Sequence, residues 1–130
     1  MNFEELHHCA IISSDYARSK HFYVDLLGLS IINEIYRKER NSYKLDLAVG
    51  NGSSGQIELF SFPTPPARPT QPEACGLRHL AFSVKNLDAS VQELNKKGVV
   101  TEPIRTDPIT GSRFTFFRDP DDLPLELYEN

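Results

Sequence analysis

The sequence predicts an α+β fold made of two copies of one module, each a strand, a helix and then about three strands. Two similar segments, L-H-H-C-A-I-I and L-R-H-L-A-F-S, begin at Leu6 and Leu77, 71 residues apart. Two strand-like runs, Q-I-E-L-F and P-L-E-L-Y, close the two halves, each with a central glutamate. A repeat of this kind indicates one supersecondary unit used twice, so we expect the two halves to fold alike.

The repeat predicts the first two elements of each module. Opening strands are expected at 6–13 and 77–84. Seven residues after each repeat histidine stands a helix N-cap candidate, Asp15 or Asn86, whose side-chain oxygen can accept from a first-turn amide. The apolar residues that follow recur at helical spacing. Each helix is expected to end at a glycine, the residue suited to the left-handed conformation that terminates helices.

Three further strands complete each module. They are expected at 29–37, 42–49 and 56–62 in the first half, and at 99–104, 112–118 and 123–129 in the second. Five prolines fall between Pro63 and Pro72. Proline lacks an amide donor and fixes φ, so this segment is neither helix nor inner strand. We therefore expect one domain, 1–130, with a first module at 1–62, a proline-rich linker at 63–72 and a second module at 73–130.

Composition narrows the class of protein. The chain has 130 residues, 39% hydrophobic and 25% charged, with a net charge of −4, which suits one compact globular domain. It has no basic run of the kind that binds nucleic acid, and no apolar stretch approaches the roughly 18 residues that cross a bilayer. The N-terminal residues MNFEELHH lack a signal-peptide pattern. A cytoplasmic protein without nucleic-acid or membrane partners is expected.

Glu58 and Glu126 are unusual because each lies between apolar strand residues, in I-E-L and L-E-L. Side chains alternate between the two faces of a strand. The apolar neighbours can pack on the helices, and the glutamates then project from the opposite, concave face. The repeat also selects His8 over His7, because His8 matches His79 whereas His7 aligns with an arginine.

These four residues, His8, Glu58, His79 and Glu126, are predicted to bind one divalent metal ion if the modules pair about a pseudo-two-fold axis. A buried carboxylate is costly, and two on one concave surface also repel each other. A cation removes both problems, and imidazole with carboxylate is a normal ligand mixture. We expect Ni²⁺ or Zn²⁺, with Co²⁺, Mn²⁺ and Fe²⁺ as alternatives. The simpler interpretations are solvated surface residues and a vestigial repeat that binds no metal.

The residues also resemble a known family, the vicinal oxygen chelate superfamily, over essentially the whole chain. The H…E…H…E order, D-Y-A-R-S-K-H-F-Y-V-D-L-L-G-L and F-F-R-D-P-D-D-L-P-L-E-L are similar to glyoxalase I of the small bacterial form. The runs E-L-F-S-F-P-T-P-P-A-R-P and P-E-A-C-G-L-R-H-L-A-F-S-V are closer still to the YaeR-type bacterial subgroup. The resemblance implies paired βαβββ modules forming an open, cupped mixed sheet around a metal. It also implies a homodimer, with the four ligands supplied by one chain or by two.

Two positions depart from glyoxalase I. Ile12 and Phe62 stand where those enzymes typically carry Arg and Asn, which help to hold glutathione. The resemblance therefore implies metal-assisted proton transfer, but these two positions do not support glutathione as the thiol that carries the substrate.

The implied activity is that of a metal-dependent lyase or isomerase of the lactoylglutathione lyase type, as in methylglyoxal detoxification. Its substrate would be a small oxo-compound or a thiol hemithioacetal. By family analogy Glu126 is the base and Glu58 assists it. Candidate substrate-binding residues are the cations Arg37, Lys44, Arg105 and Arg113 and the aromatic residues Phe60, Phe62 and Tyr128. The alternatives are an epimerase, a thiol transferase, or a binding protein without catalysis.

Overall fold

The computed structural model describes all 130 residues, which form two compact units. Unit 1 comprises residues 1–67 and unit 2 residues 68–130. The boundary falls within the proline-rich segment 63–72. No helix in the structure combines the length and apolar character needed to span a membrane.

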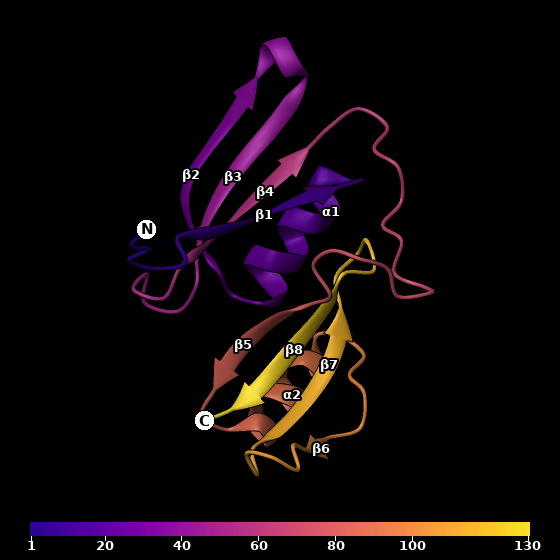
Figure 1. Cartoon of the computed structure of the whole chain (residues 1–130). Helices are drawn as coiled ribbons and strands as arrows, with labels where there is room; N and C mark the ends of the chain where they lie inside the picture. Colours follow the sequence, from indigo (N-terminus) through magenta and orange to yellow (C-terminus); the bar gives the residue numbers. More distant parts are fainter. The chain divides into compact units, whose positions relative to one another are not determined.

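Unit 1 contains one mixed sheet of four strands with its helices (Figure 1). Its elements are β1 (His8–Ser13), α1 (Tyr16–Lys20), the π-helix η1 (His21–Leu26), β2 (Ser30–Arg37), the 3₁₀-helix η2 (Lys38–Arg40), β3 (Ser42–Ala48) and β4 (Gln56–Ser61). The strand order is β1-β4-β3-β2. Strand β1 runs parallel to β4, and the other pairs are antiparallel.

Unit 2 repeats this topology. Its elements are β5 (Leu80–Val84), α2 (Leu87–Lys96), β6 (Arg105–Thr106), β7 (Arg113–Arg118) and β8 (Pro124–Glu129). The order β5-β8-β7-β6, with β5 parallel to β8, matches that of unit 1 position by position. The predicted α+β fold of two βαβββ modules with open mixed sheets is confirmed.

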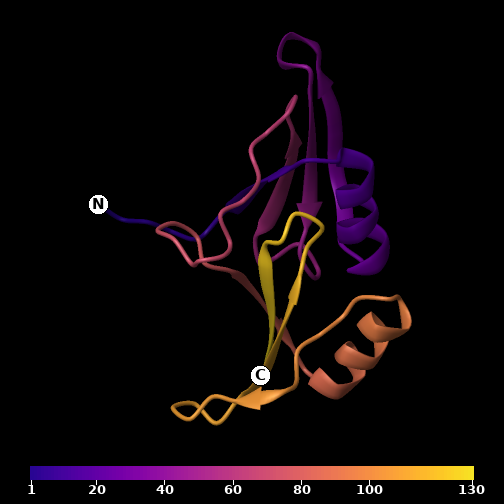
Figure 2. The same ribbon diagram turned by 90° about the vertical axis from the view of Figure 1, so that its right-hand side faces the viewer.

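In each unit the helices lie against one face of the sheet (Figure 2). The apolar strand residues on that side form the cores. In unit 1 Leu45, Leu47 and Leu59 are fully buried, and in unit 2 Leu125 is fully buried. The alternating residues of the same strands, including both glutamates, therefore lie on the sheet face opposite the helices.

The predicted helix ends are confirmed. The amide of Arg18 donates to Oδ1 of Asp15 over 3.1 Å, and the amide of Ala89 donates to Asn86 Oδ1 over 2.9 Å. The glycines that follow the helices, at positions 28 and 98, have φ of 76° and 83°. The first helix differs from the prediction in one respect, because it changes from α to π geometry at His21.

The predicted strand at 99–104 is wrong. Strand β6 consists of only two residues, which pair with Phe114 and Arg113 of β7. Before it, the amide of Glu102 donates to the carbonyl of Phe116 over 2.8 Å. Pro103 has no amide to continue the ladder, and this explains why regular pairing begins later.

Candidate metal and substrate site

The first predicted pair, His8 and Glu58, is brought together at the start of β1 and the middle of β4. Parallel pairing places Cys9 opposite Ile57, so the histidine precedes and the glutamate follows one rung of the ladder. His8 Nε2 lies 3.2 Å from Glu58 Oε2. The Glu58 side chain is 18% exposed and lies on the face opposite the helices.

The second pair, His79 and Glu126, has the same arrangement in unit 2. Leu80 pairs with Leu125, so the histidine again precedes and the glutamate follows one rung of the parallel ladder. His79 Nε2 lies 3.1 Å from Glu126 Oε2, and the Glu126 side chain is only 11% exposed. The same two atoms thus meet at the same register in both units.

The donor set of each pair suits a divalent cation. An imidazole nitrogen and a carboxylate oxygen point at each other, and both are ligand types that borderline ions accept. The second ring nitrogen of His8 is also engaged, since its Nδ1 lies 2.8 Å from Nδ1 of His7. A hydrogen bond there fixes the ring, as is usual for ligating histidines. Each unit contains one such pair, and the structure contains no group of three or more His, Cys, Asp or Glu arranged to hold a metal ion.

Lys44 lies beside the first pair. Its Nζ is 2.6 Å from Asp46 Oδ1 and 3.1 Å from Glu58 Oε1. Hydrogen bonding to Asp46, and secondarily to Glu58, raises the pKa of Lys44. Asp46 pairs directly with Glu58 across β3 and β4, so the two carboxylates share one face. Sequence reasoning missed Asp46, although alternation along the predicted strand 42–49 places it on the same face as Lys44.

In unit 2 aromatic residues occupy the positions that are charged in unit 1. Phe116 pairs with Glu126, and Phe114 pairs with Tyr128, whereas the matching residues of unit 1 are Asp46 and Lys44. Sequence reasoning also missed both phenylalanines. Alternation along the predicted strand 112–118, combined with the register to 123–129, would have found them.

The arginines at 37 and 105 lie over aromatic rings on the two glutamate faces. The guanidinium of Arg37 is 4.9 Å from the ring centroid of Phe60 and 5.7 Å from that of Phe62. The guanidinium of Arg105 lies 5.1 Å from the ring of Phe114 and 5.5 Å from the next phenylalanine of β7. Such cation–π contacts fix a long side chain over the sheet while leaving N–H donors available.

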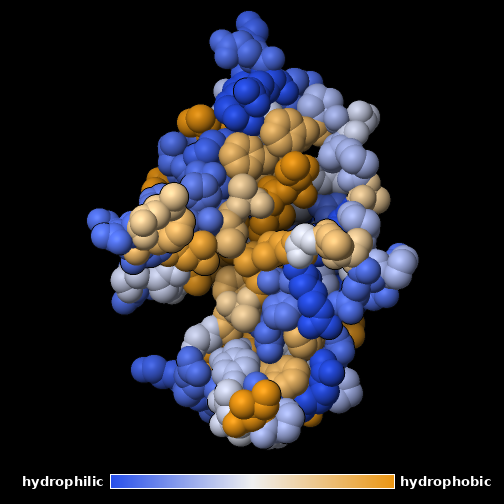
Figure 3. All heavy atoms as spheres, viewed as in Figure 1, coloured by the Kyte–Doolittle hydropathy of each residue, from blue (hydrophilic) through white to orange (hydrophobic).

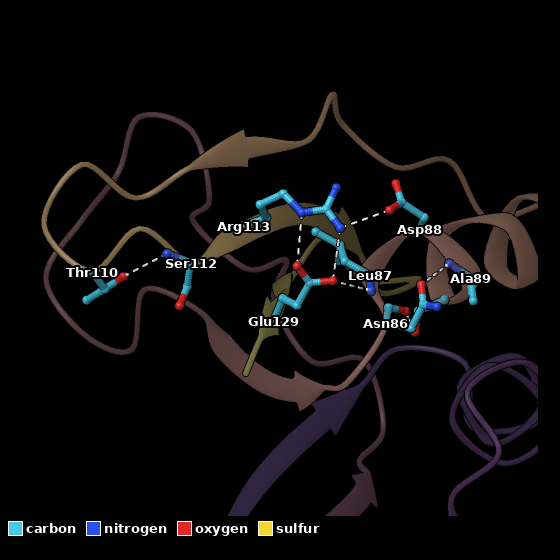
Figure 4. A network of polar contacts seen from close by, with 9 residues as sticks. Asn86, Leu87, Asp88, Ala89, Thr110, Ser112, Arg113 and Glu129 are labelled. Atoms are coloured by element: carbon cyan, nitrogen blue, oxygen red, sulfur yellow. Dashed lines mark hydrogen bonds and ion pairs between the residues drawn. The ribbon is translucent and has the colours of Figure 1, made fainter.

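Arg113 lies elsewhere. Its Nε is 2.9 Å from Glu129 Oε1, and its Nη2 is 2.8 Å from Asp88 Oδ2 (Figure 4). Glu129 Oε2 also accepts from the amide of Leu87 over 2.8 Å. These contacts tie β7 and β8 to the start of α2, on the helix side of the sheet. Tyr128, the remaining predicted residue, hydrogen-bonds through its hydroxyl to Thr110.

Comparison with known proteins places the chain in a family. Residues 5–127 match the family model of the Glyoxalase/Bleomycin resistance protein/Dioxygenase superfamily. The chain is 67% identical over 129 residues to the uncharacterized protein YwkD of Bacillus subtilis (strain 168), with 99% of each covered. It is 58% identical over 131 residues to the uncharacterized protein YaeR of Escherichia coli (strain K12), covering 99% of this chain and 98% of YaeR.

Among solved structures, the glyoxalase family protein from Enterococcus faecalis superposes with a TM-score of 0.89 at 50% identity, covering 99% of this chain and 100% of that one. A more distant relative is the 2-epi-5-epi-valiolone epimerase of Actinomyces sp, 26% identical over 94% of this chain and 77% of the epimerase. Glyoxalase I of Leishmania major, 24% identical, shares the fold with a TM-score of 0.73, over 98% of this chain and 87% of that one.

Proposed function

Because the chain belongs to the Glyoxalase/Bleomycin resistance protein/Dioxygenase superfamily, the vicinal oxygen chelate proteins, we propose that it is a metal-dependent lyase or isomerase of the glyoxalase I type. It acts on a small oxo-compound or a thiol hemithioacetal by proton transfer. The observation that carries the proposal is the Nε2–Oε2 contact between histidine and glutamate, present at the same strand register in both units. The same pair in both units supports a shared role for the two histidines and the two glutamates.

One divalent ion would be held by both pairs, His8 with Glu58 and His79 with Glu126. Each metal site needs one pair from a unit 1 and one pair from a unit 2. Both units can belong to the same chain, or one of them can belong to the second copy in a homodimer. Ni²⁺ or Zn²⁺ is proposed, with Co²⁺, Mn²⁺ and Fe²⁺ as alternatives. When bound, the ion would supply Lewis-acid stabilisation of negative charge on the substrate oxygens. We propose that the homodimer works in the cytoplasm.

Glu126 is the proposed base. It is the more buried of the two glutamates, with 11% of its side chain exposed against 18% for Glu58. Glu58 is also held by Lys44 over 3.1 Å, which fits a supporting role, whereas no lysine or arginine is paired with Glu126. Burial matters because a proton taken by Glu126 is shielded from exchange with water before it is returned.

The proposed step balances without an oxidant. Glu126 takes the proton from the carbon that carries the hydroxyl and the sulfur of the hemithioacetal, and the bonding electrons stay on the substrate. The same proton is then delivered to the neighbouring carbonyl carbon. The hydroxyl proton of the first carbon passes to the former carbonyl oxygen, so the first carbon becomes the thioester carbonyl and its neighbour carries the hydroxyl. The product is a 2-hydroxy thioester with the same atoms as the substrate.

The aromatic faces supply substrate contacts in this proposal. In unit 1, Phe60 and Phe62 lie under the Arg37 guanidinium. In unit 2, Tyr128 stacks on Phe114, with ring centroids 6.5 Å apart. These groups offer apolar walls and N–H donors to a small polar substrate.

An epimerase is the second candidate. The 26% identical relative from Actinomyces sp supports it, and the chemistry would begin in the same way, with proton removal next to a carbonyl. The two activities differ in outcome, because an epimerase returns a proton to the same carbon on the opposite face and so inverts it. A third reading, a small-molecule-binding protein, predicts no turnover at all.

The test is turnover by the metal-loaded protein on methylglyoxal mixed with glutathione or with other low-molecular-weight thiols. Thioester formation that requires added metal supports the lyase. The variant Glu126→Gln should lose about a thousandfold in rate and keep its fold. Glu93→Gln, which removes an exposed carboxylate on α2, is the matched control and should keep full rate.

Two results would count against the proposal. Full activity in Glu126→Gln would remove this residue as the base. Tight metal binding without turnover on any thiol adduct would refute the lyase, and inversion at the carbon next to the carbonyl of a chiral hydroxy-ketone substrate would then favour the epimerase.

A further inference from the structure

Unit 2 contains a cavity of about 270 Å³ on the side of the His79–Glu126 pair. It lies between the segment 68–78, the end of β7 and the start of β8. Figure 3 shows strongly hydrophilic side chains, in deep blue, over the end of β7. Four guanidinium groups line the cavity, those of Arg68, Arg78, Arg105 and Arg118.

Only two carboxylates, Glu73 and Glu102, line the same cavity. With Asp122, which pairs with Arg118, four guanidinium groups face three carboxylates, and this positive surplus would attract an anion that enters the cavity. The cavity wall also includes the aromatic ring of Phe116 and the imidazole of His79. The positive surface is thus continuous with the second half of the proposed metal site.

Three of the four arginines form exposed ion pairs, and a ligand could displace the carboxylate in each pair. Arg78 pairs with Glu73 over 2.5 Å, Arg105 with Glu102 over 3.6 Å, and Arg118 with an aspartate of the following turn over 3.0 Å. Every side chain in these pairs is at least 40% exposed. Exposed ion pairs contribute little to stability. Each contact uses one nitrogen of a guanidinium that carries five donors, so donors remain for a bound oxyanion.

Arg68 has a different role. Its Nη2 donates to the carbonyl oxygen of Leu77 and, at 3.5 Å, to that of Arg78, and its Nε is buried without a hydrogen-bond partner. It therefore fixes the proline-rich segment to the residues that lead into His79. Arg68 and the segment that it holds form one wall of the cavity, which Arg78 and His79 also line.

We propose that this cavity is the binding site for an oxyanion of the substrate, a carboxylate or a phosphate, held by Arg78, Arg105 and Arg118. The inference rests on the proposed function for the statement that the ligand is the substrate. It narrows the substrate to an acidic compound whose oxo group lies at His79 and Glu126 while its anionic group enters the cavity. Of the three arginines, sequence reasoning selected only Arg105, although Arg78 lies in the repeat, aligned with His7, and Arg118 ends the expected strand 112–118.

The test is a titration of the full chain with inorganic phosphate and, separately, with malonate, at constant ionic strength, followed by backbone amide NMR. Shifts are expected in residues 68–79, 102–105 and 116–118. The double variant Arg78→Gln/Arg118→Gln should weaken binding by at least about tenfold. Arg40→Gln, which removes an exposed arginine in unit 1, should bind as the wild type does. Preference between the two probes distinguishes phosphate from carboxylate.

Unchanged affinity in the double variant, or shifts confined to other residues, would overturn the inference. The single variants Arg78→Gln and Arg118→Gln carry the same test if the double variant does not fold. Failure of the proposed function is separate, since anion binding that depends on these arginines can occur in a protein without lyase turnover. Conversely, turnover without arginine-dependent anion binding would support the lyase activity and contradict a role of the cavity in substrate binding.

Discussion

Phe116 stands edge-on to the imidazole of His79, with ring centroids 5.1 Å apart and ring planes at 83°. The same phenylalanine pairs directly with Glu126 across β7 and β8. One aromatic ring therefore contacts the histidine and neighbours the glutamate of the second pair. Unit 1 has Asp46 at the corresponding position, so the two pairs are alike in their own atoms and different in what surrounds them.

Replacing Phe116 with alanine should weaken metal binding by about tenfold, because the imidazole of His79 loses the ring that orients it. Affinity can be measured by competition with a chromophoric chelator. Phe62→Ala, a truncation of a ring in unit 1 that does not contact either histidine, is the matched control and should retain the affinity. An equal loss in both variants would indicate general destabilisation and contradict an orienting role.

Lys44→Gln should have the opposite effect on metal binding. The ammonium group lies 3.1 Å from Glu58 Oε1, so it opposes a second cation at that carboxylate. Its removal should tighten metal binding roughly fivefold, a modest factor because the group is partly exposed and screened. Lys20→Gln, which breaks the ion pair with Glu34, is the control. Weaker metal binding in Lys44→Gln would show that the lysine positions Glu58 instead.

Acid should destabilise unit 2 partly through Glu129. Hydrogen bonding to Arg113, and then to the amide of Leu87, lowers the pKa of Glu129. Its pKa in the unfolded chain is the ordinary value, about 4.3. Between that value and the lower folded one, the unfolded chain binds more protons, so the free energy of unfolding falls as the pH falls.

Urea unfolding of the wild type and of Glu129→Gln at about pH 6 and about pH 3 measures this contribution. The free energy of unfolding of the variant should change less between the two pH values than that of the wild type. Glu93→Gln, on the exposed face of α2, should keep the wild-type pH dependence. Identical pH dependence in the wild type and Glu129→Gln would contradict the role assigned to this ion pair.

Much of the fold and the four proposed ligands could be predicted because they follow from the repeat. The spacing of His8 and His79, the N-caps Asp15 and Asn86, and alternation around each central glutamate are all periodic features of the chain. Parallel pairing of the first and last strand of each module then brings histidine and glutamate within reach. No long-range information was needed beyond the assumption that the two halves fold alike.

The features that could not be predicted depend on contacts outside the repeat. The contact of Lys44 with Asp46 and Glu58 depends on the register between β3 and β4, which places Asp46 opposite Glu58. The cavity arginines Arg68 and Arg78 lie in an irregular segment, where hydrogen bonds to carbonyl groups rather than periodicity fix their positions. The π geometry after Lys20 is equally local, since its apolar residues fit an α-helical pattern as well.

The central claim, that the two histidine–glutamate pairs serve one divalent ion, is tested most directly by the metal content of the purified full chain. Inductively coupled plasma mass spectrometry should find one divalent ion per chain in the wild type. His8→Ala and His79→Ala should each lose it, whereas His21→Ala, whose ring lies 2.7 Å from Asp25, should retain it. Two ions per chain, or one ion retained in either of the first two variants, would contradict the claim.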